Sequence, residues 1–269
     1  MPIPTCSLIV STYNRPDALR VSVESIFRQV ELPNEIIIAD DGSGQETRDL
    51  IEQLKKESPV PMVHVWQEDE GYQLARIRNR AFAAAKYDYI IQIDGDLVLD
   101  KYFVQDHLKI AKPSTFFSGS RTMIDETLTQ EVLQKSLPAQ DIPNQKEHLS
   151  KRTNALRSPL LTKLAYLYQR HDRNYKYVIG CNMAFWKKDL NIVNGYDESF
   201  KGWGKEDNDL AVRLQNAGIK LRFIKFGAIT YHLHHKVADL SAVPSNEEKL
   251  HESIREKRTF VPDGLSKYS

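Results

Sequence analysis

Apolar runs bounded by turn residues alternate with stretches of helical periodicity through the first hundred residues. Short apolar runs predict buried strands at residues 5–11, 35–39, 62–67 and 89–93. Apolar positions on one face predict helices between these strands, at residues 16–30, 47–56 and 74–85. Strands and helices that alternate in this way form parallel crossovers. We therefore expect an α/β fold with a mostly parallel central sheet and helices on both of its faces.

The later part of the chain is less regular. A short apolar run at 221–224 predicts a further strand, and "LAVRLQNAG" is typical of a helix that ends at Gly218. We expect a charged helix at 246–258, which has too few apolar positions for a core of its own, followed by a loose end, "FVPDGLSKYS". The 269 residues, 41% of them apolar, suffice for a single compact unit with a helical C-terminal tail.

Polar clusters follow the predicted strands, in the order "STYNRP", "DDGSG", "QEDEGYQ" and "DGD". Loops after the carboxyl ends of parallel strands line the ligand crevice of such sheets, so we expect all of these clusters on one rim. For "DDGSG" alone, a turn in which Ser43 caps the next helix is an alternative. The presence of Asp40 and Asp41 on the same rim as Asp94 and Asp96 favours a binding site.

Asp94 and Asp96 flank Gly95 at the end of an apolar strand. Two carboxylates this close raise each other's proton affinity unless a cation lies near them. Mg²⁺ and Mn²⁺ bind through one or two carboxylates together with substrate phosphates, and a glycine lets a phosphate or sugar approach the backbone. The alternative is a solvated Asp-Gly turn of the hairpin type.

Several motifs together carry a resemblance to a known family: "SLIVSTYNRPDAL", "IIIADDGSG", "GYQLARIRNRA", "IQIDGDLVL" and "GCNMAFWKKDLNIVNGYDESFKGWGKEDNDLAVRL". Over roughly residues 5–235 the chain resembles the family-2-type glycosyltransferases, which have the glycosyltransferase A fold. Residues 195–214 are similar to the carboxy-terminal part of galactosyltransferase-like and chondroitin-polymerase-like enzymes. The resemblance implies a nucleotide-binding half at 1–100, a metal- and acceptor-binding half of the same domain at 101–235, and a tail at 236–269.

The resemblance also implies a set of nucleotide contacts. In the family, the Asp of the "DDGS" turn hydrogen-bonds the uracil of a sugar nucleotide, which implies Asp41 with Asp40 beside it. The loop after the first strand borders the base and ribose, and the "ARN" segment faces the nucleotide. The implied nucleotide-binding residues are Thr12, Tyr13, Arg15, Asp40, Asp41, Arg76, Arg78, Asn79 and Asp94.

The "GWGKED" segment matches the loop that grips the sugars in the family. It implies Trp203 as a stacking platform, with Gly204 and Glu206 as further substrate-binding residues. Asp207 is implied as the catalytic base. An aromatic ring beside carboxylates suits a sugar, because its face packs on C–H groups while the acids hold hydroxyls. Lys205 stands where the family often has a glycine, and the alternative for the whole segment is a glycine-rich loop before an acidic helix start.

The family's Asp-x-Asp motif implies Asp96 as the more direct metal ligand. Histidines also gather after a later predicted strand, in "AITYHLHHK". Neutral imidazole completes carboxylate sites for divalent ions, and the match to the family favours His232 first and His235 second. Imidazole ligands shift the expected cofactor from Mg²⁺ toward Mn²⁺. The alternative is a set of solvated histidines at a strand exit.

The chain carries 37 Lys and Arg residues against 36 Asp and Glu residues, for a net charge of +1. This balance lacks the basic surplus of a duplex-binding protein, so we expect no nucleic acid partner. The first residues lack the basic start and the long apolar core of a signal peptide, from which we expect a cytoplasmic location. Cys6 and Cys181 have apolar neighbours and are expected to be buried thiols.

One segment departs from the charge balance. Residues 146–176, within a basic helical segment expected at about 126–176, carry eight Lys or Arg residues against one Glu and one Asp. With the apolar face of "LLTKLAYLY", this composition is typical of a helix on a membrane surface. Such a helix would bring the protein to a lipid-linked acceptor at the inner face of the membrane. The alternative is a solvated helix that packs Leu160, Leu164 and Leu167 into the core.

The chemistry of the predicted site agrees with the resemblance. Sugar transfer from a nucleoside diphosphate needs a Lewis acid for the departing diphosphate and a base for the acceptor hydroxyl. We expect an inverting, metal-dependent glycosyltransferase that moves a hexose or N-acetylhexosamine from a UDP-sugar to a saccharide or glycolipid acceptor in surface polysaccharide assembly. UDP-galactose or its N-acetyl relative is the first expectation. The alternatives are a nucleotidyltransferase that binds sugar nucleotides and a non-catalytic carbohydrate-binding module.

Overall fold

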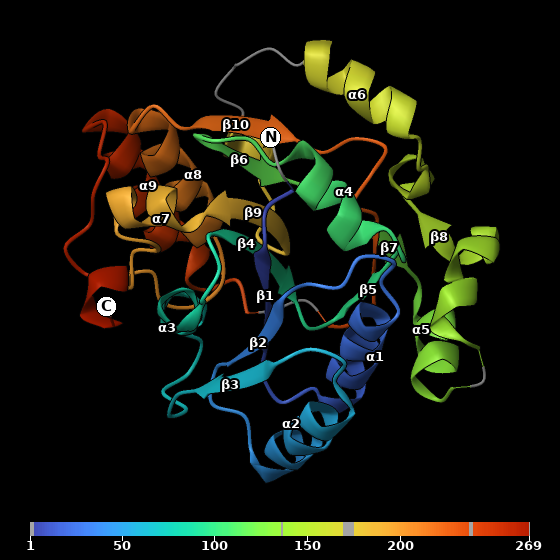
Figure 1. Cartoon of the computed structure of the whole chain (residues 1–269). Helices are drawn as coiled ribbons and strands as arrows, with labels where there is room; N and C mark the ends of the chain where they lie inside the picture. The colour runs from blue at the N-terminus through green and yellow to red at the C-terminus, as the bar shows by residue number, and fades with distance from the viewer. Residues whose placement is uncertain (1–2, 136, 169–174, 237–238, 269) are drawn as a thin grey trace.

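A computed structural model of the protein describes residues 3–135, 137–168, 175–236 and 239–268 (Figure 1). Its centre is a seven-stranded sheet with the order β10-β6-β9-β4-β1-β2-β3. The strands predicted in the first hundred residues are all present and pair in parallel, as expected from the crossovers between them. They are β1 (Cys6–Thr12), β2 (Glu35–Asp40), β3 (Met62–Trp66) and β4 (Tyr89–Asp94).

The other half of the sheet contains one antiparallel strand, β9, which lies between β4 and β6. The edge strand β10 is again parallel to its neighbour β6. The sheet is therefore mostly parallel, as predicted. The strands of this half are β6 (Thr115–Ser118), β9 (Asn182–Trp186) and β10 (Lys220–Phe223).

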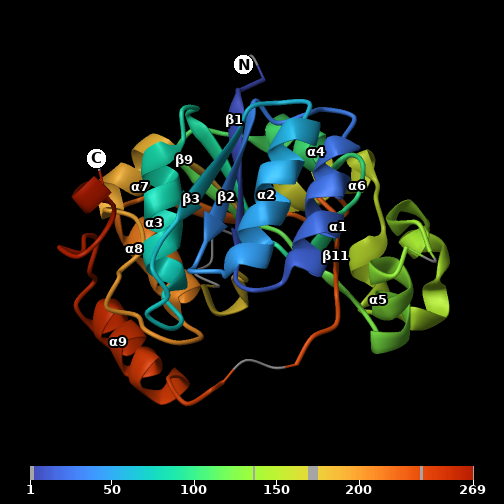
Figure 2. The same ribbon diagram turned by 90° about the horizontal axis from the view of Figure 1, so that it is seen from below.

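Helices cover both faces of the sheet, because successive side chains of each buried strand point to opposite faces. Leu8 and Val10 of β1 belong to a core with α1, α2 and α4, whereas Ile9 belongs to a core with α3, α7 and α8. Figure 2 shows α1 and α2 on one side of β1–β3 and α3 on the other. These helices are α1 (Pro16–Phe27), α2 (Gln45–Glu57), α3 (Leu74–Ala84), α4 (Phe103–Ile110), α7 (Lys187–Val193) and α8 (Glu206–Asn216).

A smaller sheet, with the order β5-β11-β7-β8, adjoins the first. Val98, Ile124 and Tyr231 of this sheet share a core with Leu128 of α5. β5 directly follows the Asp-Gly-Asp turn but pairs with β11, so the turn carries the chain from one sheet to the other. The alternative of a hairpin turn is therefore wrong. The elements are β5 (Leu97–Leu99), β7 (Thr122–Ile124), β8 (Leu149–Ser150), β11 (Thr230–His232) and α5 (Glu126–Leu133).

The basic segment expected at about 126–176 is not one helix. Short 3₁₀ turns separate α5 from α6 (Pro159–Tyr168), which lies at the edge of the molecule (Figure 1). Leu160 and Leu164 of α6 are exposed, so the alternative that packs them into the core is wrong. The side chain of Leu167 lies outside the described residues. Within the described ranges, every helix falls short of the length and apolar character that crossing a membrane requires.

In the described residues 243–268, the C-terminal tail packs against the rest of the protein. It begins with α9 (Val243–Arg255), close to the predicted helix. Val261 and Leu265 beyond α9 are buried, and the Asn194 side chain bonds the backbone of Val261 and of Ser266. The predicted loose end is therefore wrong, because this segment is bonded to Asn194 and Leu265 belongs to the core on the side of α3 and α7.

Candidate active site

The loops after the parallel strands open into one cleft, with a volume of about 370 Å³. The common rim that was predicted from the polar clusters is therefore present. Many of the predicted site residues line this cleft: Thr12, Tyr13, Arg15, Asp41, Asp94, Asp96, Trp203, His232 and His235.

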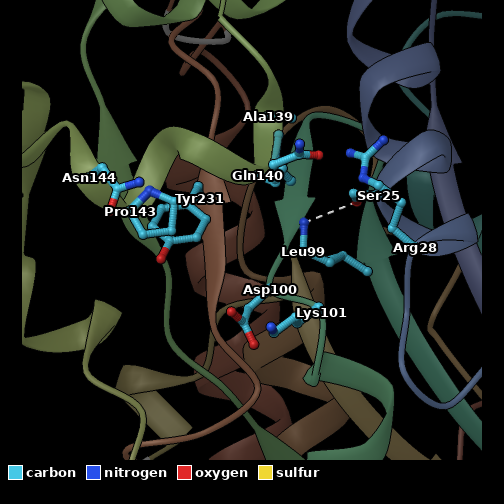
Figure 3. Close-up of a pocket in the computed structure, with 11 residues that line it drawn as sticks. Ser25, Arg28, Leu99, Asp100, Lys101, Ala139, Gln140, Pro143, Asn144 and Tyr231 are labelled. Carbon is cyan, nitrogen blue, oxygen red and sulfur yellow. Dashed lines mark hydrogen bonds between the residues drawn. The ribbon is translucent and has the colours of Figure 1, made fainter.

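A larger cavity, of about 540 Å³, is lined in part by β5 and β11 of the smaller sheet (Figure 3). Tyr231 and Pro143 line one side of it, and Ser25 and Arg28 line the other. Tyr231 and His232 are consecutive in β11, so their side chains face opposite sides of the strand. None of the predicted site residues lines this cavity, and we place the active site in the cleft.

Asp41 lies in the cleft where β2 ends. It is buried, and its carboxylate accepts hydrogen bonds from the backbone N–H of Gln73 at 2.9 Å and from the side chain of Gln67. Burial raises the pKa of Asp41 to about 6. Tyr13 also lines the cleft, and its hydroxyl donates to Asp69 Oδ2 at 2.9 Å. A buried acceptor and an exposed aromatic ring in one cleft suit a planar base that carries N–H donors.

The "DDGSG" turn ties the loops after β1 and β2 together. Ser43 Oγ accepts a hydrogen bond from the backbone N–H of Asn14 at 2.9 Å, and Asn14 Oδ1 accepts one from Gly44 at 2.8 Å. Helix α2 has no side-chain cap at its N-terminus. The alternative in which Ser43 caps this helix is therefore wrong.

The close approach of the Asp-Gly-Asp turn to the end of β1 requires a glycine at position 95. Its N–H donates to the carbonyl of Ser11 at 2.7 Å, and a Cβ at this position would lie 2.9 Å from the same oxygen. The space that we expected to admit a ligand is thus filled by the end of β1. This close approach fixes Asp94 and Asp96 beside β1.

Asp96, His232 and His235 form a cluster, the metal trio, whose ligand atoms all lie within 4.8 Å of one another. His232 Nε2 is 3.7 Å from Asp96 Oδ1, and His235 Nε2 is 3.2 Å from Asp96 Oδ2. Among the described residues, Asp96 Oδ1 and His232 Nδ1 are buried without a hydrogen-bond partner. An unsatisfied carboxylate oxygen that faces imidazole nitrogens fits a divalent cation.

The charge states around the metal trio also fit a cation. Burial lowers the pKa of His232 to about 4, so its ring is neutral near pH 7 and has a lone pair to offer. Two imidazoles with one carboxylate favour Mn²⁺ over Mg²⁺. Arg15 Nη1 lies 3.4 Å from Asp96 Oδ2 and brings a second positive charge to this part of the cleft.

Arg78 connects the Asp-Gly-Asp turn with the start of α8. This arginine is only 1% exposed. Its Nη2 donates to Asp94 Oδ1 at 2.9 Å, and its Nη1 donates to Asp207 Oδ1 at 2.9 Å. Glu206 Oε1 lies 3.7 Å from the same Nη1. One guanidinium thus brings together carboxylates from distant parts of the chain, and it places Asp207 on the same side of the molecule as the turn that carries Asp96.

Two donors hold Asp207 by a single oxygen. Tyr196 donates its hydroxyl to Asp207 Oδ1 at 2.8 Å, and Arg78 donates to the same atom. No residue that the structure describes donates a hydrogen bond to Oδ2. A Cβ at Gly180 would overlap this carboxylate, so the backbone there must be glycine. The arrangement orients Asp207 and leaves Oδ2 able to accept a proton.

Glu206 is buried next to Asp207. Burial raises the pKa of Glu206 to about 8, with the charge of Asp207 acting in the same direction and that of Arg78 against it. Its Oε2 has no hydrogen-bond partner among the described residues. A carboxyl group that keeps its proton near pH 7 both donates and accepts hydrogen bonds, which suits a sugar hydroxyl.

Trp203 is 44% exposed and lies between two glycines in a loop before α8. Gly202 and Gly204 have φ of +71° and +105°, a region that favours glycine. Lys205 has φ of 76°, so it adopts the conformation of the glycine that the family often has there. The loop therefore keeps a glycine-like backbone despite the lysine.

Some predicted nucleotide contacts lie outside the cleft. Asp40 is fully buried and accepts a hydrogen bond from the backbone N–H of Ser43 at 2.8 Å. Arg76 pairs with Glu70 at 2.8 Å. Asn79 is buried and bonds the backbone just after α7. Their contacts give these side chains structural roles, and their positions do not support contact with a nucleotide.

Other residues of the cleft were not predicted. Tyr72 belongs to the "QEDEGYQ" cluster, which was the available signal for it. Arg121 and Met123 also line the cleft, and no motif marked them. His234 lines it too and belongs to the histidine cluster of "AITYHLHHK", from which His232 and His235 were preferred. Arg121 Nη1 lies 3.6 Å from Cys181 Sγ, and no carboxylate among the described residues pairs with it. It adds a cation to the wall of the cleft.

Comparisons with known sequences identify related proteins. The model of Glycosyl transferase family 2 matches residues 7–191, and the model described as the N-terminal domain of galactosyltransferase matches residues 164–236. A chondroitin synthase of Escherichia coli is 28% identical over 243 residues, which are 84% of this chain and 34% of that protein. A hyaluronan synthase of Pasteurella multocida is 30% identical over 238 residues, which are 84% of this chain and 24% of that protein. The chain thus spans about a third or less of the length of these relatives.

Solved structures share the fold. Staphylococcus aureus TarS 1–349 in complex with UDP-GlcNAc has a TM-score of 0.64 at 13% identity, with 98% of this chain and 69% of that chain covered. The mannosyltransferase PcManGT from Pyrobaculum calidifontis, in complex with GDP-Man and Mn²⁺, has a TM-score of 0.59 at 14% identity. That match covers 100% of this chain and 74% of the other. The predicted glycosyltransferase A fold is confirmed, and the chain belongs to glycosyl transferase family 2.

Proposed function

We propose that the protein is an inverting, metal-dependent glycosyltransferase that moves a hexose or N-acetylhexosamine from a UDP-sugar to a saccharide or lipid-linked acceptor. The observation that carries the proposal is the metal trio at the Asp-Gly-Asp turn together with Arg78, which bonds both Asp94 of that turn and Asp207. Membership in glycosyl transferase family 2 favours sugar transfer over the nucleotidyltransferase and carbohydrate-binding alternatives.

The similar proteins support the donor and the kind of product. They include synthases of chondroitin and of hyaluronan, and TarS in complexes with UDP and with UDP-GlcNAc. We therefore assign the protein to surface polysaccharide assembly. UDP-galactose or its N-acetyl relative is our first choice of donor, since the galactosyltransferase model covers the carboxy-terminal half of the site.

The donor would lie along the loops after β1 and β2. Asp41 accepts the N–H of the uracil, and Tyr13 lies beside the base. Thr12 and Arg15 follow toward the diphosphate, where Arg15 and Arg121 offer positive charge. Arg78 orients Asp94 rather than the nucleotide, because its guanidinium is occupied by carboxylates.

The metal trio has the donor set for Mn²⁺ or Mg²⁺, with Asp96, His232 and His235 as the ligands. When bound, the cation supplies positive charge that stabilises the departing diphosphate. The protein itself contributes the neutral state of His232, which burial maintains.

The acceptor would lie between Trp203 and Asp207. Trp203 packs on the acceptor sugar and Glu206 hydrogen-bonds a hydroxyl. Asp207 Oδ2 takes the proton of the attacking hydroxyl as its oxygen bonds to the anomeric carbon and the bond from that carbon to the diphosphate breaks. Attack from the side opposite the leaving group inverts the anomeric configuration, so an α-linked donor yields a β-linked product.

A panel of UDP-sugars tests this function. The purified protein is incubated with Mn²⁺ and each UDP-hexose or UDP-N-acetylhexosamine, with and without oligosaccharide acceptors, and released UDP is measured. We expect release with a UDP-sugar that stops when EDTA removes the metal. Asp96→Asn should lower the rate at least about 10- to 100-fold, a loss seen even for residues that only support metal ligands.

Asp100→Asn is the matched control, because Asp100 lies outside the cleft and faces the other cavity. It should keep the rate of the unmodified protein. Full activity in EDTA would contradict the metal dependence, and release from none of the UDP-sugars would contradict the donor class.

A peripheral contact with the inner face of the membrane forms part of the proposal. Helix α6 and the residues before it expose an apolar stripe flanked by cations. An apolar stripe with basic flanks binds anionic lipid surfaces by burial of the leucines and by attraction of the charges. The stripe consists of Leu156, Leu160, Leu161 and Leu164, and the flanking cations are Lys151, Arg152 and Lys163.

Vesicle binding should depend on this stripe. The protein is expected to co-sediment with vesicles that contain phosphatidylserine, and more weakly with neutral ones. Leu160→Glu with Leu164→Glu should lower the bound fraction at least about tenfold, because two apolar side chains leave the interface. Ile192→Glu, at an exposed apolar position on α7, is the control and should bind normally. Equal binding to both vesicle types would overturn the membrane contact.

A further inference from the structure

The loop that carries Trp203 has no regular secondary structure. We call residues 201–205 the tryptophan loop. Gly202, Gly204 and Lys205 of this loop have positive φ. Neither a helix nor a strand ladder therefore fixes its backbone. On the cleft side, the N–H of Gly202 donates to the carbonyl of Tyr72 at 3.2 Å. Glycines leave such a segment a high conformational entropy unless other contacts restrict it.

A buried side chain from the tail restricts the loop from behind. Asn246 of α9 is 1% exposed. Its Nδ2 donates to the carbonyl of Lys201 at 3.1 Å and to that of Gly204 at 3.0 Å. These carbonyls flank Trp203, so a single amide group fixes both ends of the turn that presents the ring.

The other contacts between α9 and this region are weaker candidates for this role. Lys205 Nζ pairs with Glu247 at 3.3 Å, but both side chains are solvent-exposed enough for water and salt to screen the pair. Ala242 fills the space beside Gly202, where a Cβ would lie 2.5 Å from the Ala242 Cβ. Among the described residues, Asn246 is the buried residue whose side chain bonds the loop backbone directly. The buried Asp209 bonds the Lys205 carbonyl only through its own backbone N–H, as part of the first turn of α8.

We propose that Asn246 is a positioning residue for the acceptor, acting through the tryptophan loop to hold Trp203 in the cleft. Helix α9, which was predicted as part of an appended tail, would then help to form the acceptor site. The role in acceptor binding rests on the proposed function, whereas the restraint of the loop does not. An aspartate in place of Asn246 keeps the shape but has no N–H to donate and would face two carbonyl oxygens with a carboxylate.

Hydrogen exchange tests the restraint without any substrate. Amide exchange of a peptide that covers 199–206 is compared in the unmodified protein, Asn246→Asp and Asn246→Ala, with melting temperature recorded for each. We expect exchange in this peptide to accelerate at least about tenfold in both variants. Asn216→Asp is the matched control, because Asn216 Nδ2 also donates to a backbone carbonyl of the tail, that of Arg258, at 2.9 Å. It should leave exchange at 199–206 unchanged.

Kinetics then test the role in acceptor binding. Asn246→Ala should raise the KM for the acceptor about tenfold or more and leave the KM for the donor within about twofold, because misplacement of a binding group weakens only what it contacts. In a Trp203→Ala background the same substitution should have little further effect, since the ring it positions is already gone.

The outcomes separate the two proposals. Unchanged exchange in both Asn246 variants overturns the positioning role, and so does an Asn246 effect of full size in the Trp203→Ala background. If no UDP-sugar supports transfer, the proposed function fails, while the exchange data still decide whether Asn246 restrains the tryptophan loop.

Discussion

Replacement of Asp207 by asparagine is expected to lower kcat about 10²- to 10⁴-fold, the range of a positioned general base. The affinity for UDP should change by less than about twofold, because Asp207 is not among the residues that line the cleft proposed to hold the nucleotide. The amide has nearly the same shape, and its oxygen still accepts the hydrogen bonds that Arg78 and Tyr196 donate. It cannot take up the proton of the acceptor hydroxyl.

Steady-state rates with a saturating donor, together with UDP titrations by calorimetry, measure these effects. Asp49→Asn makes the same chemical change at an exposed position on α2 and should leave the rate unaltered. A variant at position 207 that keeps more than a tenth of the activity would contradict the role as base. So would an α-linked product in the NMR spectrum, because inversion of an α-linked donor gives a β-linked one.

Arg78→Met is expected to destabilise the protein by about 3–5 kcal/mol, the usual cost of removing one partner from a buried ion pair. Arg78 is almost completely buried and serves Asp94, Asp207 and Glu206 at once. Without the guanidinium these carboxylates face each other with no counter-charge. Urea denaturation gives the free energy of unfolding, and sugar transfer should be lost together with stability.

The loss of stability in Arg78→Met should depend on pH. Burial already raises the pKa of Glu206 to about 8, and Arg78 opposes that rise. Removal of Arg78 raises this pKa further. Between the pKa of an unfolded glutamate and about pH 8, Glu206 stays protonated in both folded proteins, so both lose the same stability; above about pH 8 it ionises in the unmodified protein but not in the variant, which continues to lose stability. The deficit should therefore be smaller at pH 6, where Glu206 is protonated in both folded proteins, than at pH 9, where Glu206 is ionised in the unmodified protein alone.

Arg76→Met provides the control for Arg78, since Arg76 lies one half-turn away on α3 and pairs with the exposed Glu70. Exposed pairs contribute about 1 kcal/mol or less, so this variant should unfold near the free energy of the unmodified protein. Equal destabilisation by both substitutions would contradict the central role of Arg78.

The first half of the fold was predictable because its strands are buried on both faces and its helices show one apolar face. These patterns predict both ends of each of β1–β4 to within one residue, and they bring Asp41, Asp94 and Asp96 to one rim. The later strands, such as β7 and β8, are too short for a periodic signal. Arg121 lies next to such a strand, which explains why it was not anticipated.

Motifs identify neighbouring residues but do not say where each side chain points. The "DDGS" match includes Asp40 and Asp41, yet consecutive residues at a strand end face opposite ways, and only Asp41 reaches the cleft. The "ARN" segment lies on a helix, so Arg78 and Asn79 project in different directions. The burial of the last residues was equally hidden, because Val261 and Leu265 lie in an irregular segment without periodicity.

The position of β9 has a consequence for synthesis of the chain. β9 separates β4 from β6, and it is translated long after both. Until it emerges from the ribosome, β4 has a free edge of unpaired N–H and C=O groups, and β6 cannot join the sheet. Free edges of this kind invite aggregation between nascent chains. Chaperones that shield β4 during this interval should therefore increase the yield of folded protein.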